Sequence, residues 1–524
     1  MKILLKNGKI TTHEASFKGC IEIIDQKISE VQKGQFEGDN PDFDFVLDCT
    51  NKFIIPGIID PHVHLRDWGQ KYKETVETGS LAAKAGGVTT VLAMPNTQPR
   101  ITNIEMIEQY RGLLENDAYI DTGLYMNLSN DFELSQIDEA ASKGIAGIKI
   151  YPGDQSSALQ LEWKPLLLIE ESLNERFNDD TWDIADLKRA FHNEINRLIG
   201  MDAFYKEIVN WQKLFFYMAD FEMPILFHPD TPISQLKRRN RYQSLKAQKF
   251  SDLIAHSKTY SIFQEALFAL YITKIIEVLI NNLKMRKLSE KFPTVCFCHV
   301  SCPEVVDIVN DFRDNNHNVN LKIEAAPHHL FLNYERKVDT PAFMKVLQPV
   351  RSQENMEKMQ NLLKNGYLDY FGTDHAPHSI EEKTKDFLSA PSGISSLDVY
   401  VKFILTKVMD GIFNLMDFVR YSAYNPAKIF NIDAKGCIKA GYDADLVVFS
   451  QTEPHQLNPE TFKSKAKWSP YPLEHIKVDL DYVFLRGYLI QTSDLQILQK
   501  YPNLAETYNT KLGKYSIWSK ENDS

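Results

Sequence analysis

Short apolar runs alternate with helical stretches through most of this 524-residue chain, and this alternation limits the fold more than any other feature. Six of the runs predict strands, at 53–60, 88–92, 147–151, 224–227, 294–298 and 369–372. Between the first two, the pattern predicts a short helix over 78–85 that Gly86-Gly87 would end. Repeated strand–helix units are typical of a parallel sheet, which a chain of this length can close into a barrel. We therefore expect an α/β protein built on a TIM-like (β/α)8 barrel.

The two ends of the chain lack this alternation and are similar to each other. Strand-like runs lie near both termini, at 2–5, 20–24, 45–48, 441–449 and 482–487. We expect residues 1–54 and 431–495 to build one small composite β-sandwich domain from both termini. Residues 55–430 would form the barrel, with a helical insertion at about 155–222, and residues 496–524 a peripheral tail.

Composition and charge exclude several classes of protein. Hydrophobic residues make up 43% of the chain and charged residues 25%, which is typical of globular proteins and not of disordered or fibrous ones. The net charge of −11 argues against nucleic acid or an anionic membrane as a partner. The basic run 237–241 has no aromatic residue interleaved with it, so we interpret it as a solvated helix face.

Cysteine usage and the apolar stretches favour a cytoplasmic protein. Six cysteines do not make a disulfide framework, and we interpret Cys296, Cys298 and Cys302 as small buried hydrophobic residues. The longest apolar stretch, 262–283, carries four charged or amide side chains, which a membrane span rarely tolerates. It predicts a helix packed on a larger body, and the N-terminal run is too short and interrupted for a signal peptide.

Histidine and aspartate side chains follow the predicted strands. His62 and His64 end the first strand, and an extended His-x-His directs both imidazoles to one side. His228, His299 and Asp374 each follow a later strand. Because the carboxyl ends of barrel strands form one face, these side chains predict a metal site there.

Lys149 lies within the apolar run 147–151, where a bare ammonium group is costly to bury. One interpretation is that it pairs with a nearby carboxylate. The other is that its amine reacts with carbon dioxide to give a carbamate, which can bridge two cations. Burial favours the neutral amine that this reaction requires.

Four motifs carry a resemblance to a known family. They are His62-Val63-His64-Leu65-Arg66, Gly86-Gly87-Val88-Thr89-Thr90, Met94-Pro95-Asn96-Thr97-Gln98-Pro99 and Gly372-Thr373-Asp374-His375-Ala376-Pro377-His378. They closely resemble motifs of dihydroorotase, a cyclic amidohydrolase of pyrimidine biosynthesis, and the resemblance runs from about residue 50 to residue 450. It implies reversible cyclisation of N-carbamoyl-L-aspartate to L-dihydroorotate with release of water.

The resemblance also implies a cofactor, namely two zinc ions bridged by N6-carboxylated Lys149. The other ligands would be divided between the ions, with His62, His64 and Asp374 on one and His228 and His299 on the other. Asp374 would in addition shuttle the proton between the attacking hydroxide and the departing nitrogen.

Arg66, Asn96 and His378 match the residues with which the family binds the free carboxylate of its substrate. The planar guanidinium of Arg66 suits that group. The alternatives are a surface salt bridge for Arg66 and a turn residue for Asn96.

Two features depart from many bacterial relatives. Many bacterial relatives carry aspartate at the position of Lys149. This chain is therefore more similar to the lysine-containing group, which includes the animal multifunctional enzymes. The segment 345–351 also differs from the Asn-Pro-Pro-Leu-Arg of many bacterial members, so a loop that contacts the substrate is expected to differ.

Two other functions remain as alternatives. Hydantoinases, dihydropyrimidinases and allantoinases share the metal ligands, but they do not typically carry an arginine such as Arg66 beside the His-x-His motif. Non-catalytic dihydroorotase-like scaffolds typically lose metal ligands, whereas this chain keeps all six. Relatives are often dimers and some associate with aspartate carbamoyltransferase. We therefore expect a small-molecule substrate and a homodimer, and treat that transferase as a candidate partner.

Overall fold

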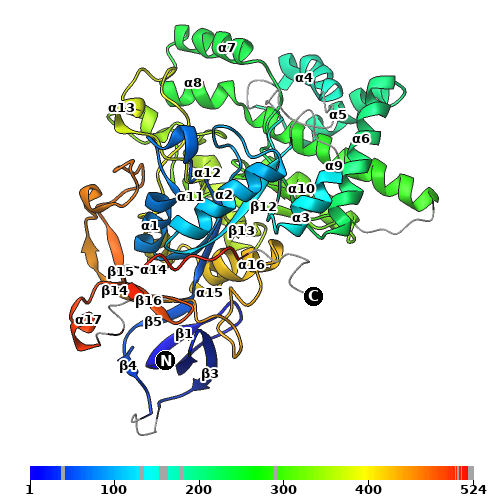
Figure 1. Cartoon of the computed structure of the whole chain (residues 1–524). Helices are drawn as coiled ribbons and strands as arrows, with labels where there is room; N and C mark the ends of the chain where they lie inside the picture. The colour runs from blue at the N-terminus through cyan, green and yellow to red at the C-terminus, as the bar shows by residue number, and fades with distance from the viewer. Residues whose placement is uncertain are drawn as a thin grey trace.

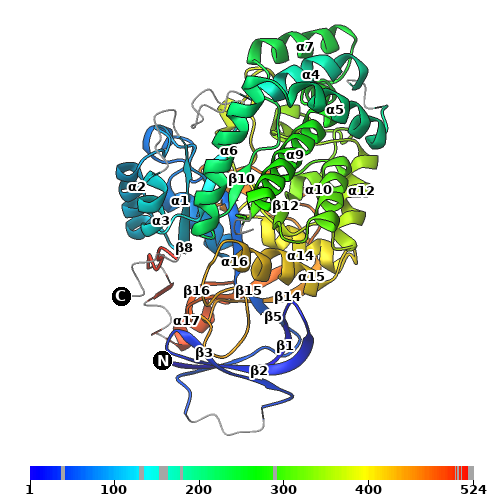
Figure 2. The same ribbon diagram turned by 90° about the vertical axis from the view of Figure 1, so that its right-hand side faces the viewer.

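The computed structural model describes residues 1–36, 42–128, 135–152, 163–177, 181–286, 292–501, 503, 507–508 and 510–516. Their central feature is a barrel of parallel strands surrounded by helices (Figure 1). A second sheet and a group of helices lie at opposite ends of the barrel in both views (Figure 2).

Eight strands form the barrel, and each pairs in parallel with the next. They are β6 (Ile58–Val63), β7 (Val88–Ala93), β8 (Asp121–Asn127), β9 (Gly147–Ile150), β10 (Ile225–Phe227), β11 (Val295–Phe297), β12 (Leu321–Ala325) and β13 (Tyr370–Phe371). A parallel bridge between Val63 and His375 joins the last strand region to the first. The predicted (β/α)8 barrel is confirmed, although the six predicted strands did not include β8 and β12.

Helices follow most barrel strands and cover the outside of the barrel. The first, α1 (Val76–Gly86), begins at the Thr75 side-chain cap and ends at Gly87, whose φ of 88° is a left-handed conformation that suits glycine. The other helices on the barrel are α2 (Ile104–Asp117), α3 (Ser135–Ser142), α10 (Pro303–Asn315), α11 (Pro327–Phe331), α12 (Gln353–Lys364), α13 (Ile380–Lys383), α14 (Tyr400–Met409), α15 (Leu415–Val419) and α16 (Asn425–Ile429).

A group of helices between β9 and β11 forms the end of the molecule opposite the second sheet (Figures 1 and 2). It comprises α4 (Lys164–Phe177), α5 (Ile184–Leu198), α6 (Asp202–Asp220), α7 (Gln235–Ala247), α8 (Asp252–Thr259) and α9 (Ile262–Arg286). Trp163, Trp211 and Phe268 form an aromatic cluster that joins this group to the barrel core.

Two sequence expectations fall on these helices. The stretch 252–283 is long and apolar enough to cross a membrane by composition, but 72% of its most apolar window is buried inside the structure, as in a core helix of a globular protein. The basic run 237–241 lies on α7, where Lys237, Arg239 and Asn240 are exposed. Arg238 is buried, so the expectation of a solvated face is wrong for this residue. Its buried guanidinium pairs with Asp230 at 2.8 Å.

The second sheet contains eight strands from both ends of the chain. They are β1 (Lys2–Thr11), β2 (Ser16–Ile24), β3 (Lys27–Lys33), β4 (Phe45–Asp48), β5 (Phe53–Pro56), β14 (Leu446–His455), β15 (Ile476–Leu485) and β16 (Tyr488–Thr492). Antiparallel pairing of β5 with β14 joins the two ends, which confirms a composite β domain. The short helix α17 (Gln496–Lys500) packs on its core through Ile497.

A buried ion cluster connects this sheet to the barrel. Asp121, at the start of β8, forms ion pairs with Lys435, whose Nζ lies 2.8 Å from its carboxylate, and with Arg486. Lys435 Nζ also lies 2.5 Å from an oxygen of Asp445. Residues 514–516 lie against the same end of β8 through backbone hydrogen bonds with Thr122.

Candidate metal and substrate site

The predicted site residues converge on one cavity of about 320 Å³ beyond the carboxyl ends of the barrel strands. Eight of the nine line it directly, namely His62, His64, Arg66, Asn96, His228, His299, Asp374 and His378. The ninth, Lys149, is fully buried within β9. Residues far apart in the sequence are thus brought together because each lies in or follows a strand of the same barrel.

One group of side chains surrounds Asp374. The Asp374 Oδ1 atom lies 3.0 Å from His64 Nε2 and 3.4 Å from His62 Nε2. The ligand atoms of these three residues lie within 4.8 Å of one another, so a single cation could contact all of them. His62 and His64 point to the same side because they are two residues apart on extended backbone, as the sequence predicts.

A second group contains His228 and His299. They follow β10 and β11, and His228 Nδ1 lies 3.0 Å from His299 Nε2. The His62 and His299 rings are 5.4 Å apart between centroids, so the two groups are neighbours. The arrangement offers two adjacent sets of ligands.

The protonation states of these residues suit a metal site. Burial lowers the pKa of His64 to about 4 and that of His228 to about 3, and it lowers the pKa of His299 well below its usual value. Their imidazoles are therefore neutral at neutral pH and can donate lone pairs. Burial raises the pKa of Asp374, but the hydrogen bond with His64, together with the neighbouring imidazoles, holds it well below its usual value. Asp374 is therefore an anion that could bind a cation.

Lys149 occupies the base of the site. Its Nζ has no hydrogen-bond partner among the described residues, and it lies 5.4 Å from the ring centroid of Tyr151. Burial lowers the pKa of Lys149, but Cys298, Tyr151 and Glu324 act in the opposite direction and raise the pKa overall. Burial alone therefore does not make this amine neutral, which corrects the expectation from sequence. The interpretation of a simple pair with a carboxylate has no hydrogen bond to support it.

Glu324 is a site residue that the sequence analysis missed. Its Oε1 accepts hydrogen bonds from His62 Nδ1 at 2.7 Å and from the backbone amide of His299 at 2.9 Å. The first bond leaves His62 Nε2 free to face Asp374. Glu324 is the penultimate residue of β12 and so lies at the same edge of the barrel as the histidines that follow β10 and β11. Prediction of β12 would have drawn attention to it.

Asp60 is the second missed residue. It accepts hydrogen bonds from the backbone amide of Thr373 at 3.0 Å, from the Thr373 hydroxyl at 2.6 Å and from the His62 amide at 3.2 Å. Burial raises the pKa of Asp60 to about 6. It fixes the backbone next to Asp374 relative to the first strand.

The residues expected to bind a carboxylate lie together at one end of the cavity. Arg66 is buried, which excludes the alternative of a surface salt bridge, and its Nη2 lies 3.4 Å from His378 Nε2. Lys73 Nζ, missed from the sequence, lies 3.1 Å from the other ring nitrogen of His378. Burial and these two cations lower the pKa of His378 far below its usual value. This end of the cavity is positive and suited to an anion.

Asn96 has a defined orientation. Its Oδ1 lies 2.5 Å from His64 Nδ1 and accepts the proton of that nitrogen, which leaves His64 Nε2 free. The Asn96 amide nitrogen remains available as a donor in the cavity that Asn96 lines. Asn96 is thus more than a turn residue.

Cys298 and the segment 345–351 border the site. The Cys298 Sγ lies close enough to His62 and Glu324 to count as a ligand, but burial raises the pKa of this thiol far above its usual value. It remains a neutral buried group, as expected from sequence. In the segment that departs from bacterial relatives, Leu347 lines the cavity and the Gln348 amide donates to the Pro229 carbonyl at 2.6 Å.

Comparisons of the sequence with known proteins identify related families. Residues 51–146 match the dihydro-orotase-like family, and residues 248–478 match the amidohydrolase family. A dihydroorotase of Methanosphaera stadtmanae is 30% identical over 429 residues, covering 82% of this chain and 83% of that protein. A dihydroorotase of Enterococcus faecalis is 25% identical and covers 95% of this chain and 100% of that protein.

Solved structures of similar fold are hydantoinases and dihydropyrimidinases. An L-hydantoinase from Arthrobacter aurescens has a TM-score of 0.73 at 21% identity and covers 94% of this chain and 96% of its own. A dihydropyrimidinase from Brevibacillus agri has a TM-score of 0.72 at 21% identity and covers 94% and 95%. At this identity the likeness establishes the fold, while the sequence relatives establish the family. The chain belongs to the dihydroorotase family of the amidohydrolases.

Proposed function

We propose that this protein is a dihydroorotase, which interconverts N-carbamoyl-L-aspartate and L-dihydroorotate with release or uptake of water. One observation carries the proposal: the buried Arg66 lies in the same cavity as the predicted metal ligands. Dihydroorotate has a carboxylate on its ring, and hydantoin and dihydrouracil do not. A fixed guanidinium next to the hydrolytic centre distinguishes these substrates.

The residues of the cavity fit a pair of zinc ions. Four imidazoles, of which those of His64, His228 and His299 are neutral at neutral pH, and the Asp374 carboxylate form a set of nitrogen and oxygen donors that suits zinc. His62, His64 and Asp374 would hold one ion, and His228 and His299 the other. When bound, the two ions supply Lewis acidity, which polarises the scissile carbonyl and lowers the pKa of water.

Carboxylated Lys149 fits between the two groups of ligands. The Lys149 Nζ is buried and lacks a hydrogen-bond partner among the described residues. Two divalent cations would raise the cost of an adjacent ammonium and favour the neutral amine, which reacts with carbon dioxide. The resulting carbamate is an anion with two oxygen donors, so Lys149 could contribute to both ions.

The chain's own side chains would carry the proton and orient the substrate. Asp374 faces the cavity with its carboxylate ionised and is placed to accept a proton from the attacking water and deliver it to the ring nitrogen. Arg66, Asn96 and His378, which line the same cavity, would hold the substrate carboxylate. Binding at both ends sets the angle at which the amide carbonyl meets the nucleophile.

The quaternary and cellular parts of the proposal rest on the family resemblance. They comprise a homodimer, a cytoplasmic location and aspartate carbamoyltransferase as a candidate partner. The domain limits 1–54, 55–430, 431–495 and 496–524 belong to the same proposal. Light scattering of the purified chain, alone and mixed with the transferase, tests the two assembly proposals.

A substrate panel tests the activity. Zinc-loaded protein is incubated separately with dihydroorotate, dihydrouracil and hydantoin, and ring opening is followed. Turnover of dihydroorotate alone supports the proposal. Turnover of only the uncharged rings would assign a hydantoinase-type activity instead, and no turnover with two metals bound would favour a non-catalytic scaffold.

A further inference from the structure

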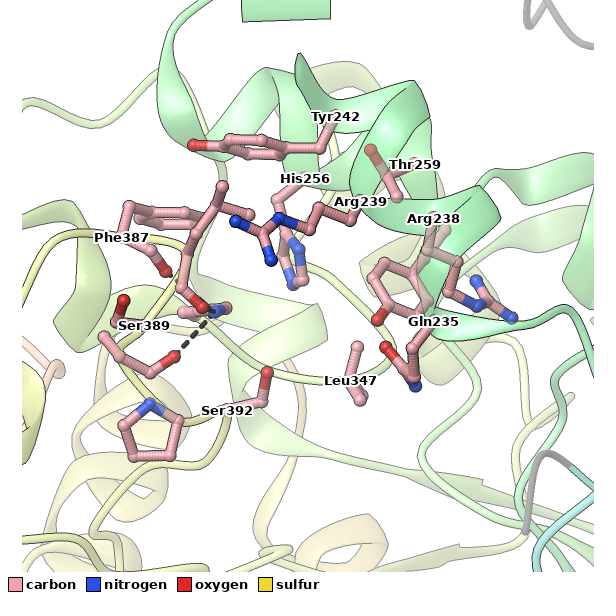
Figure 3. A pocket seen from close by; sticks show the side chains of 15 residues that line it. Gln235, Arg238, Arg239, Tyr242, His256, Thr259, Leu347, Phe387, Ser389 and Ser392 are labelled. Carbon is pink, nitrogen blue, oxygen red and sulfur yellow. Dashed lines mark hydrogen bonds between the residues drawn. The ribbon is translucent and has the colours of Figure 1, made fainter. Parts of the chain in front are cut away.

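Residues 387–393, which we call the partition segment, separate two cavities. On one side, Ser392 and Gly393 line the 320 Å³ cavity of the candidate site. On the other side, residues 387–392 line a second cavity of about 630 Å³ (Figure 3). Ser392 borders both, so the cavities are neighbours across this segment.

Lys345 holds one half of the partition segment through its backbone. This lysine lies on the neighbouring segment 345–351, and its side chain is buried. Its Nζ donates to three carbonyl oxygens, those of Phe387 at 2.7 Å, Leu388 at 3.2 Å and Ala390 at 2.6 Å. All three protons of the ammonium group therefore have acceptors.

Lys383 holds the other half. It ends α13 just before the partition segment and is fully buried. Its Nζ donates to the carbonyl oxygens of Pro391 at 2.9 Å, Gly393 at 2.9 Å and Lys345 at 3.4 Å. The last of these bonds links the two lysines, and the Gly393 amide donates to the same Lys345 carbonyl at 2.9 Å.

Neither ammonium group has a direct carboxylate partner among the residues that the structure describes. All six hydrogen-bond acceptors are backbone carbonyl oxygens. Burial lowers the pKa of Lys345 to about 8 and that of Lys383 to about 7, so keeping either charge inside the protein is costly. Ammonium–carbonyl bonds are charge-assisted and hold the backbone more firmly than neutral hydrogen bonds do.

The partition segment is connected to the candidate carboxylate-binding residues. The Ser392 carbonyl accepts a hydrogen bond from His378 Nε2 at 3.0 Å. A Cβ atom at Gly393 would lie 2.5 Å from the Ala376 carbonyl oxygen, so this end of the segment packs closely on the chain before His378. A shift of the segment would therefore move His378 and the wall of the cavity together.

We propose that Lys345 and Lys383 are positioning residues for the reaction: by binding the carbonyls of the partition segment, they hold Ser392, Gly393 and His378 where the substrate ring and its carboxylate are bound. The inference rests on the proposed function of the cavity and adds a specific support to it. It also gives a role to the segment 345–351, which departs from the bacterial pattern.

The test compares Lys345→Met and Lys383→Met with a matched control, Lys385→Met, which removes an exposed lysine three residues before Leu388. Each zinc-loaded variant is assayed for kcat and KM with dihydroorotate, for bound metal, and for amide hydrogen exchange in the peptide spanning 387–393. We expect KM to rise about tenfold or more in the two test variants, with kcat changed by less than about threefold. Exchange in the partition segment should become about tenfold faster, with metal content unchanged. The control should match the wild-type protein.

Lys383→Gln provides a second variant if loss of the buried side chain prevents folding. Its amide can still donate two hydrogen bonds without a charge, so a smaller rise in KM and in exchange is expected. Folded variants in which KM is unchanged would overturn the proposal, whether exchange is faster or not, because the lysines would then be structural only.

The same measurements separate this inference from the proposed function. If the wild-type protein does not act on dihydroorotate, the proposed function fails. Hydrogen exchange is independent of activity. Faster exchange in the lysine variants would therefore still support the inference that Lys345 and Lys383 fix the position of the partition segment. Unchanged exchange would overturn it.

Discussion

Glu324 orients two predicted metal ligands at once, through the His62 ring and the His299 backbone amide. Glu324→Gln keeps the size of the side chain but exchanges a charged acceptor for a neutral amide. We expect metal affinity to fall about 10–100-fold, which is the usual effect of losing a partner of a ligating histidine. Competition with a chelator measures this, with the exposed Glu357→Gln as control. Unchanged affinity in Glu324→Gln would contradict the orienting role.

Lys149 is the residue on which the proposed binuclear site depends. In Lys149→Ala we expect activity to be lost together with at least one equivalent of metal, because the proposed carbamate would supply an oxygen ligand to each ion. Small carboxylic acids should restore part of the activity by replacing the carbamate. The surface variant Lys143→Ala, before the same strand, serves as control. Two metals and full activity in Lys149→Ala would remove the bridging role.

At the scale of elements, most of the barrel and of the site could be predicted from one pattern: an apolar run that ends in a polar residue. This pattern found six strands and five site residues, namely His62, His64, His228, His299 and Asp374. Lys149 was identified as a lysine inside an apolar run, and Arg66, Asn96 and His378 were identified from the family resemblance. It missed β12 because Lys322 and Glu324 interrupt the apolar run, and the partners that satisfy them, Asp369 and His62, come from other strands. Lys73 was missed because it lies in a loop, where spacing carries no information about the cavity.

The buried amine of Lys383 makes the stability of the folded chain depend on pH. Burial lowers the pKa of Lys383 from 10.5 to about 7, so between these values the unfolded chain binds a proton that the folded chain does not. The contribution of Lys383 to stability therefore rises with pH across this window. In Lys383→Met this contribution is absent.

The melting temperature of Lys383→Met relative to the wild-type protein should therefore fall as pH rises from about 6.5 to about 9.5. Thermal unfolding followed by circular dichroism measures this difference, with Lys385→Met expected to give a flat line. A melting temperature of Lys383→Met that does not fall relative to the wild-type protein as pH rises would show that the pKa of Lys383 is not lowered in the folded chain.

At the scale of the whole molecule, the ion cluster of Asp121, Lys435 and Arg486 joins the composite sheet to the barrel. Lys435→Met removes the ammonium group that Asp121 and Asp445 share, so Asp121 keeps only Arg486 as a charged partner and Asp445 loses its charged partner at 2.5 Å. We expect the free energy of unfolding to fall by about 3–5 kcal/mol. The partly exposed pair Lys402–Asp479, at 3.5 Å, is the control, and Lys402→Met should cost less than about 1 kcal/mol.

The same variant tests whether the sheet influences the site. Asp121 begins β8, and the candidate site lies at the carboxyl ends of the strands. We therefore expect kcat and KM of the folded Lys435→Met protein to equal those of the wild type. A large change in kcat would show that the joint between sheet and barrel also positions the cavity.

The central claim is that a fixed arginine beside a binuclear metal site makes this chain act on a ring that bears a carboxylate. The most direct measurement is kcat/KM of Arg66→Met for dihydroorotate, with bound metal measured on the same sample. Because Arg66 does not belong to the ligand set, we predict a fall of about a hundredfold or more with metal content unchanged. An unchanged kcat/KM would place carboxylate recognition elsewhere and contradict the account.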